Sequence, residues 1–341
     1  MRFLLLIFFC FFFVRNGFSQ DPHFSQFYSS PLTLNPAFAG KFDGNLRIAG
    51  NYRNQWPTID KAYQTETISA DFPILQHKIA YTDTWGVGLM YFSDKSANGA
   101  VNVNYISAGT AFHKGLDENG YTQLGFGFQA TYANMNINTS HLTFEDQLTP
   151  FGFTGVTQEN FGGSTTLQNH YFDFNAGILF TTSTTDNNNF YAGVSVYHIN
   201  RPKEDFTGGT YSNGLYLLYP RATFHAGGYF PVGDITTLHL SGLYSTQAGA
   251  NETVLGGALQ FSLDGSNSNS TSNFYIGSWL RFGDAIIPYL GLDFNAFRLG
   301  LTYDVNTSQL KSASQSQGGI ELSLIYIQKS GQSRGLPCPK F

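Results

Sequence analysis

The chain has 341 residues, of which 16% are aromatic and only 12% are charged, and it contains 37 glycines. So little charge beside so many aromatic side chains is unusual for a soluble globular domain, and the abundance of Phe and Tyr excludes a disordered chain. The glycines follow no three-residue period, which excludes a collagen-like chain. The formal net charge is −5, and no tract rich in Lys and Arg occurs, which argues against nucleic acid as a partner.

Residues 1–19 have the features of a secretory signal peptide. An uninterrupted apolar run follows Arg2 over residues 3–14, and the small residues Gly17 and Ser19 suit cleavage just before Gln20. The run is too short for a membrane-spanning helix, which needs roughly 20 residues. Cleavage would leave Cys338 as the one cysteine, so we expect no intramolecular disulfide.

Past this segment, apolar and polar residues alternate with a period of two over most of the chain. In the stretch 297–305, every odd-numbered residue is apolar or aromatic, and every even-numbered one is polar or glycine. The same alternation recurs at 124–132 and 172–178. Because successive side chains of a strand point to opposite faces, the pattern predicts strands with one apolar and one polar face.

Such strands fit either a soluble sandwich or a membrane β-barrel whose apolar face meets lipid. Most segments are about ten residues long, which is the length of a tilted strand that crosses a bilayer, whereas sandwich strands average about six. Aromatic residues stand near the segment ends, as interfacial girdles require. No amphipathic helix is predicted between the segments. We therefore favour an all-β, antiparallel, up-and-down transmembrane barrel.

The alternating segments number fourteen, although twelve or sixteen strands remain open on the sequence alone. The predicted barrel occupies residues 45–328, and a Gly/Pro-containing tail, 329–341, follows it. The predicted strands are 45–53, 63–72, 84–93, 100–113, 121–133, 171–182, 189–198, 220–230, 235–245, 252–263, 273–283, 285–294, 296–306 and 317–328.

The lengths of the connections predict the sidedness of the barrel. The longest connections, 134–170, 199–219 and 307–316, are all odd-numbered and so leave the barrel at the same end. Most even-numbered connections are short, such as the turn at 231–234. Long loops outside and short turns inside are typical of bacterial outer-membrane barrels. An even strand count places both termini on one side, which we expect to be the periplasm.

Long motifs open the mature chain at 20–28 and 31–40, where Gln20-Asp21-Pro22-His23-Phe24-Ser25-Gln26-Phe27-Tyr28 leads to Pro31-Leu32 and Leu34-Asn35-Pro36-Ala37-Phe38-Ala39-Gly40. Further distinctive stretches are 51–56, 142–144, 171–177, 191–198, Arg221 with 225–227, 284–288, 299–304 and Cys338-Pro339. On these residues, the chain resembles the PorP/SprF family of the type IX secretion and gliding system of Bacteroidota. The resemblance covers essentially all of the mature chain.

This resemblance implies an outer-membrane barrel that serves protein secretion. It implies one of two kinds of partner for the barrel. The first is a secreted protein with a type IX C-terminal domain, whose export or surface attachment the barrel aids. The second is a periplasmic peptidoglycan-binding protein or a ring lipoprotein of the motor assembly.

The segment 20–44, which precedes the first strand, is predicted to be a plug or docking arm. Its three prolines prevent a regular strand, and a fourteen-stranded lumen is too wide for wall side chains alone to fill. The alternative is a periplasmic leader that only caps the barrel base. The candidate plug or partner-binding residues are Pro22, His23, Phe24, Phe27, Tyr28, Leu32, Leu34, Asn35, Pro36 and Phe38.

Two further groups of residues are candidate functional positions. Charges on the polar strand faces would point into the lumen, as a network of paired groups or as a grip on an inserted peptide; they are Asp173, Arg281, Arg298, Asp304 and Glu321. The two longest loops carry aromatic residues that suit protein recognition; the candidates are Phe144, Phe151, Phe153, Tyr211 and Tyr216.

The sequence indicates no catalytic site, metal site or cofactor. The histidines are scattered, neither G-x-S-x-G nor H-E-x-x-H occurs, and no acidic or histidine cluster has metal-ligand spacing. The leading hypothesis is a non-enzymatic type IX barrel, embedded in outer-membrane lipid, that binds a secreted protein or a motor-assembly partner. The alternatives are a general diffusion porin or solute channel and, less favoured, an outer-membrane hydrolase.

Overall fold

The computed structural model describes residues 21–59, 63–76, 78–159, 164–185, 187–204, 217–263, 272–329 and 338–339. The predicted signal peptide and the loop candidates Tyr211 and Tyr216 lie outside these ranges. Among the described residues, no helix is long and apolar enough to cross a membrane.

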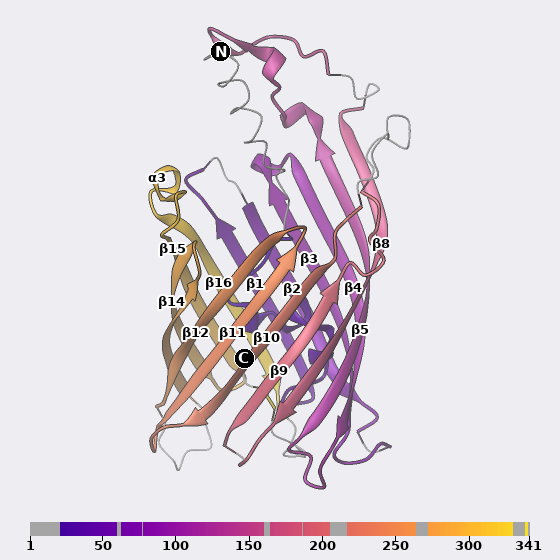
Figure 1. Cartoon of the computed structure of the whole chain (residues 1–341), viewed down its shortest axis with the longest axis vertical. Coiled ribbons are helices and arrows are strands. Elements are labelled where there is room, and N and C mark those ends of the chain that lie inside the picture. The colour runs from indigo at the N-terminus through magenta and orange to yellow at the C-terminus, as the bar shows by residue number, and fades with distance from the viewer. Residues whose placement is uncertain are drawn as a thin grey trace, which may run out of the picture.

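Within the described ranges, fourteen antiparallel strands form one closed barrel, which confirms the predicted fold class and strand count (Figure 1). Each strand pairs with its neighbours in chain order, and β1 pairs with β16 to close the ring, with Leu46 opposite Gln328. The barrel strands are β1 (Leu46–Gln55), β2 (Tyr63–Ile74), β3 (Thr84–Ser96), β4 (Val101–Gly115), β5 (Gln123–Asn138), β8 (Thr166–Thr182), β9 (Asn189–Tyr197), β10 (Arg221–Pro231), β11 (Thr236–Gln247), β12 (Ala250–Ser262), β13 (Ser272–Arg281), β14 (Ala285–Phe294), β15 (Phe297–Asn306) and β16 (Gln317–Gln328).

Short elements outside the barrel wall lie before β1 and in the connections. A small hairpin of β6 (Leu148–Thr149) and β7 (Gly152–Phe153) stands in the connection between β5 and β8. The helices are η2 (Phe27–Ser29), α2 (Pro31–Leu34), η3 (Pro36–Phe38), η4 (Ala97–Gly99), η5 (Thr139–His141), η6 (Glu145–Gln147) and α3 (Lys311–Ser314).

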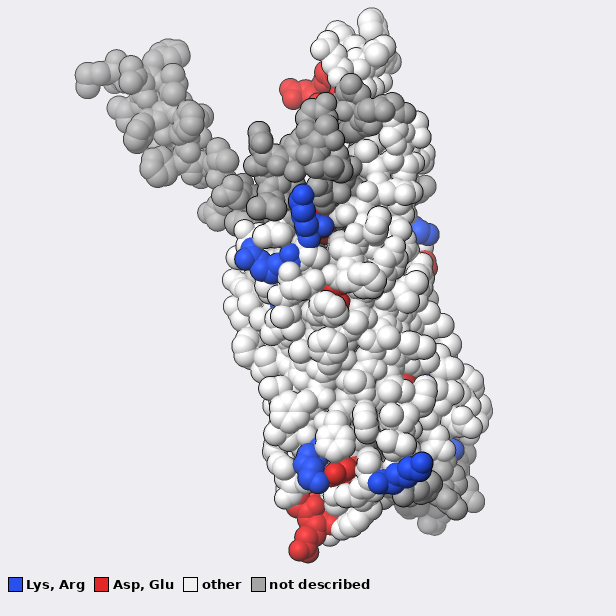
Figure 2. Space-filling view, turned by 90° about the vertical axis from the view of Figure 1, so that its right-hand side faces the viewer, with Lys and Arg blue, Asp and Glu red and all other residues white. Residues whose placement is uncertain are grey.

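The alternation of the sequence becomes an apolar outer face and a polar inner face. In β15, Phe297, Leu299 and Leu301 are exposed on the outside, whereas Thr302 and Asp304 are buried on the inside. On the face in Figure 2, charged side chains gather toward the two ends, and the broad zone between them is almost free of charge. This zone is the surface that a bilayer would cover.

The three longest connections leave the barrel at one end, which we call the loop side; the opposite end is the turn side. The connection between β5 and β8 and the connection that carries α3 both lie at the upper end of Figure 1. β1 starts and β16 ends on the turn side, because Leu46 pairs with Gln328.

β5 and β8 extend five residues farther toward the loop side than the alternation predicts. Asn134 pairs with His170 and Asn138 with Thr166, so the connection shrinks to residues 139–165. The outward-facing residues of these extensions, such as Asn134, Asn136 and His170, are polar, because the strands project beyond the zone that lipid would cover. The apolar outer face therefore ends before strand pairing does.

Candidate functional site

Residues 21–44, which we call the lumen segment, run through the inside of the barrel along its length. Asp21 lies at the loop side, where its backbone N–H donates to Gln247 Oε1 at 2.8 Å, and Gln247 is the last residue of β11. Lys41 lies at the turn side, where its Nζ donates to Gln123, the first residue of β5. The segment then joins β1 at that same end.

This path differs from the expectation that both termini lie on one side. The parity of the strand count constrains only the start of β1 and the end of β16. The lumen segment is long enough to return through the barrel, so the first described residue, Asp21, lies at the opposite end from the start of β1.

The lumen segment folds into short turns rather than a strand because of its prolines. Pro31 and Pro36 stand at the first positions of α2 and η3, where a missing N–H leaves no bond unmade. The Asn35 side chain caps η3 by accepting from the Ala37 N–H at 2.8 Å. Of the ten candidate residues, Pro22 and His23 are half-buried, and the others are buried: Phe24, Phe27, Tyr28, Leu32, Leu34, Asn35, Pro36 and Phe38.

Asp21 anchors the loop-side end of the lumen segment. Its carboxylate lies 2.7 Å from His198 Nε2 and 3.4 Å from an Arg221 nitrogen, and it accepts from Gln247 Nε2 at 2.9 Å. Burial raises the pKa of Asp21, but the charges of His198 and Arg221 outweigh this and hold that pKa well below its ordinary value. Asp21 is therefore ionised and tied to the ends of three strands.

A second set of contacts, the loop-side polar site, holds Ser25 and Gln26. Two carboxylates and two guanidinium groups of the wall meet there, all of them buried. Both Glu321 oxygens accept backbone N–H groups, from Ser25 at 2.7 Å and from Gln26 at 2.9 Å. The wall residues of this site are Arg53 on β1, Arg281 on β13, Thr302 and Asp304 on β15, and Glu321 and Ser323 on β16.

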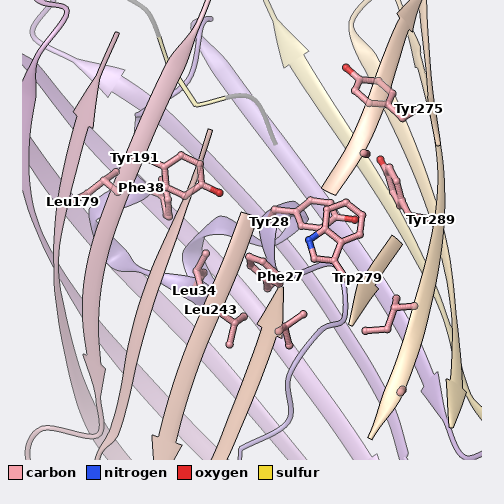
Figure 3. Close-up of a cluster of buried hydrophobic side chains, with 14 of the residues drawn as sticks. Phe27, Tyr28, Leu34, Phe38, Leu179, Tyr191, Leu243, Tyr275, Trp279 and Tyr289 are labelled. Carbon is pink, nitrogen blue, oxygen red and sulfur yellow. The ribbon is translucent and has the colours of Figure 1, made fainter. Parts of the chain in front are cut away.

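The middle of the lumen segment packs against an aromatic cluster (Figure 3). The Tyr28 ring packs against both Trp279 and Tyr289, with ring centroids at 4.7 and 5.8 Å, and Phe38 meets Tyr191 edge-on at 5.9 Å. These rings come from β9, β13 and β14 as well as from the lumen segment. The barrel core is therefore built jointly by the wall and by residues that precede it in the chain.

Glycines on the inner wall give the lumen-segment backbone room to pass. A Cβ at Gly127 would collide with the Ala37 nitrogen and the Pro36 carbonyl carbon, and a Cβ at Gly177 would collide with the Asn35 side chain. Asn35 in turn donates to the Ile178 carbonyl oxygen at 3.1 Å. Here glycine is required by close approach rather than by backbone conformation.

The turn-side end of the lumen segment is held by a buried ion pair. Arg47 and Asp71 lie 2.9 Å apart; Arg47 also donates to the Phe38 carbonyl oxygen at 3.0 Å, and Asp71 accepts the Gly40 N–H at 2.8 Å. The wall therefore holds the lumen segment at both ends and along its middle.

The predicted lumen charges separate into three groups. Arg281, Asp304 and Glu321 meet in the loop-side polar site. Asp173 lies 2.9 Å from His198 Nδ1, next to the Asp21 anchor. Arg298 pairs with Asp293 and donates to the Tyr275 hydroxyl at 2.9 Å on the turn side.

Sequence reasoning did not single out several wall residues that contact the lumen segment. They are Arg47, Arg53, Asp71, His198 and Gln247. The period-two pattern could have placed the first two in the lumen, because Arg47 and Arg53 have the same strand parity as Ala49 and Asn51 and share the inner face of β1 with them. Their partners come from distant strands, which no periodicity reveals.

The candidate loop residues that the structure describes lie away from the lumen. Phe151 stands at the tip between β6 and β7 and is 89% exposed, and Phe153 is also exposed, whereas Phe144 is half-buried at the base. Val156 beside them is exposed too. The hairpin stands beyond the barrel mouth (Figure 1), and its exposed Phe151 and Phe153 are therefore open to solvent there.

The described part of the C-terminal tail lies against the inner wall. The Tyr229 hydroxyl of β10 donates to the Cys338 carbonyl oxygen at 3.3 Å. Cys338 is the free cysteine of the described chain. In that part of the chain, no group of three or more His, Cys, Asp or Glu side chains could hold a metal ion.

We expect a cysteine at position 22 to react with a membrane-impermeant maleimide in intact cells, in a background with Cys338→Ser. The lumen-segment path places Pro22 at the loop side, which we expect to face the exterior. Phe151→Cys is the positive control, and Val232→Cys, exposed in a turn-side connection, should react only after lysis. Labelling of position 22 only in broken cells would contradict the expected sidedness of this end.

Comparisons with known proteins give one family match and several distant solved structures. The family model described as "Type IX secretion system membrane protein PorP/SprF" matches residues 16–326. No curated protein matches the chain. Among solved structures, a Pseudomonas aeruginosa FadL homologue is 12% identical, with 87% of this chain and 94% of that chain covered and a TM-score of 0.47. The Pseudomonas putida toluene transporter TodX is 10% identical, with 91% and 94% covered and a TM-score of 0.45.

The family match spans most of the chain, and it includes the lumen segment and nearly the whole barrel wall. An apolar outer face on a closed barrel is what an integral outer-membrane protein requires. The chain therefore belongs to the PorP/SprF family of type IX secretion system membrane proteins and is an integral β-barrel of the outer membrane.

Proposed function

We propose that this barrel is a non-enzymatic adaptor of type IX secretion. It binds the C-terminal domain of a secreted surface protein, or a partner of the motor assembly, and so aids export or surface attachment. The observation that carries the proposal is the filled lumen, in which residues 21–44 contact the inner wall from the loop side to the turn side. A barrel filled in this way suits binding better than diffusion of solutes.

The hairpin tip supports contact with a protein at the loop side. Phe151 and Val156 are about nine-tenths exposed, although large apolar side chains seldom stand so far out without a partner. Aromatic side chains are enriched at protein interfaces because they bury much apolar area. The periplasmic peptidoglycan-binding and ring lipoprotein partners would meet the turn side instead.

The test is affinity purification of the chain from native outer membrane. We expect proteins with a type IX C-terminal domain, or motor components, to co-purify with the wild type. Phe151→Ser with Phe153→Ser should reduce the yield of a surface partner by about tenfold, the equivalent of about 1.4 kcal/mol. Val232→Ser, an exposed change on the turn side, is the matched control.

Two outcomes would contradict parts of this proposal. An unchanged yield from the hairpin variant would remove the hairpin as the contact. If neither kind of partner co-purifies, and if cells that lack the chain keep all their secreted proteins at the surface, the adaptor function is wrong.

A further inference from the structure

The loop-side polar site grips the lumen segment by its backbone. Both carboxylate oxygens of Glu321 accept consecutive main-chain N–H groups, from Ser25 at 2.7 Å and Gln26 at 2.9 Å. A carboxylate that accepts two backbone N–H groups makes charge-assisted bonds, which are roughly twice as strong as neutral ones. Such contacts require a turn whose consecutive N–H groups point the same way, as residues 25–26 form just before η2, and they depend very little on its sequence.

The site also forms hydrogen bonds with the side chains of Ser25 and Gln26. The Ser25 hydroxyl lies 2.8 Å from both Asp304 oxygens and accepts from Arg281 at 2.7 Å. The Gln26 amide donates to the Glu321 carbonyl oxygen at 3.2 Å and accepts from the Ser323 hydroxyl at 2.7 Å. A small hydroxyl residue followed by an amide residue therefore matches this site.

The wall forms this site without help from the lumen segment. Arg53 pairs with Asp304 at 2.8 Å and with Glu321 at 3.1 Å, and Arg281 pairs with Asp304 at 2.9 Å. These groups stand on four strands of a closed ring. The ring holds their geometry, so a receptor of the same shape would remain if Ser25 and Gln26 withdrew.

The two halves of the lumen segment are held by different kinds of contact. Apart from Phe24, whose ring centroid lies 6.4 Å from that of Phe92, residues 21–26 meet charged and polar wall groups, which water can solvate again after release. Residues 31–40 carry buried apolar side chains and lie against wall glycines, so their release would expose apolar surface. The loop-side half can therefore leave the wall while the other half still fills the lumen.

We propose that the loop-side polar site is a peptide-binding site whose resident ligand is residues 21–26 of the chain itself. A segment of a secreted partner that carries a Ser-Gln pair, or a closely similar pair, in the same kind of turn takes the place of this ligand. The inference rests on the adaptor function proposed above and names the site at which the partner is held. The tethered ligand has an effective concentration on the order of millimolar, so the intact chain binds a free peptide weakly.

The test measures binding of a fluorescent peptide of residues 20–30 to the full-length barrel in detergent by anisotropy. The site is vacated by Ser25→Pro with Gln26→Pro, which removes both backbone donors as well as both side chains. We expect this variant to bind the peptide at least about tenfold more tightly than the wild type, because the tethered competitor is gone. Adding Glu321→Ala to the variant should abolish the binding.

Controls distinguish specific binding at this site from nonspecific peptide binding. Thr33→Ala changes another residue of the lumen segment, whose hydroxyl bonds within the segment to the Ser30 carbonyl oxygen, so it should bind the peptide as weakly as the wild type. A peptide with both Ser25 and Gln26 changed to proline should not bind the vacated barrel. Heat-modifiable gel mobility shows whether each variant is a folded barrel, and Ser25→Pro alone, which removes one of the two backbone donors, replaces the double proline variant if that one does not fold.

Equal affinity in the wild-type and vacated barrels, or binding that survives Glu321→Ala, would overturn the peptide site. If secreted partners still co-purify with the chain while the peptide fails to bind, the inference is wrong and the adaptor function stands. If neither occurs, both fall.

Discussion

Gly127→Val is expected to turn a nearly silent barrel into one with steady single-channel conductance in planar bilayers. A side chain at position 127 would occupy the space of the Ala37 nitrogen and the Pro36 carbonyl carbon. The lumen segment could then no longer seat against β5, while valine itself suits a strand. The wall should stay closed, because its strand pairing does not involve the lumen segment.

Gly50→Val is the matched control for this experiment. The nearest atoms to a Cβ at position 50 are the Thr67 and Leu324 carbonyl oxygens, at 3.7 and 4.0 Å, and no atom of the lumen segment is among them. This variant should remain silent. If the wild-type barrel already conducts steadily, the general diffusion porin becomes the better hypothesis. The filled lumen would then no longer support an adaptor function.

Arg53→Met is expected to lower the free energy of unfolding by about 3–5 kcal/mol, because it leaves buried carboxylates without their partner. Arg53 is 1% exposed and pairs with both Asp304 and Glu321. Arg281 still faces Asp304, but Glu321 would lose the guanidinium that neutralises it. Equilibrium urea unfolding in detergent or lipid vesicles, followed by gel mobility, measures the change.

Lys114→Ala provides the contrast with a solvent-exposed ion pair. Lys114 lies 2.9 Å from Asp83, but its side chain is 56% exposed, so its removal should cost less than about 1 kcal/mol. Similar losses for Arg53→Met and Lys114→Ala would mean that the buried network contributes no more than a surface pair.

The wall of this barrel was predictable from the sequence because lipid imposes a strict rule on it. A residue such as Phe172 or Leu299 must be apolar where it faces hydrocarbon, and its neighbours point inward, so a period of two results. Beyond the bilayer, outward-facing residues face water and need not be apolar. The prediction therefore missed the loop-side ends of β5 and β8, where outward-facing residues such as Asn134 and Asn138 are paired in the sheet but are polar.

The interior could be predicted only in part. The aromatic residues and prolines of the lumen segment indicated a packed, non-strand element. Its direction through the barrel depends on contacts such as Ser25 with Glu321, separated by 296 residues, and Asp21 with Gln247, separated by 226. Local patterns contain no information about pairings over such distances, and each of these polar residues would suit a water-filled lumen equally well.

The threaded lumen segment also bears on how the molecule is assembled. The segment is synthesised before any strand, whereas β16, which carries Glu321, is synthesised last of the barrel strands. The seam between β1 and β16 closes the ring, and the same strand supplies the carboxylate that holds Ser25 and Gln26. Closing the seam therefore also completes the enclosure of the lumen segment, so the interior is filled as the wall is finished.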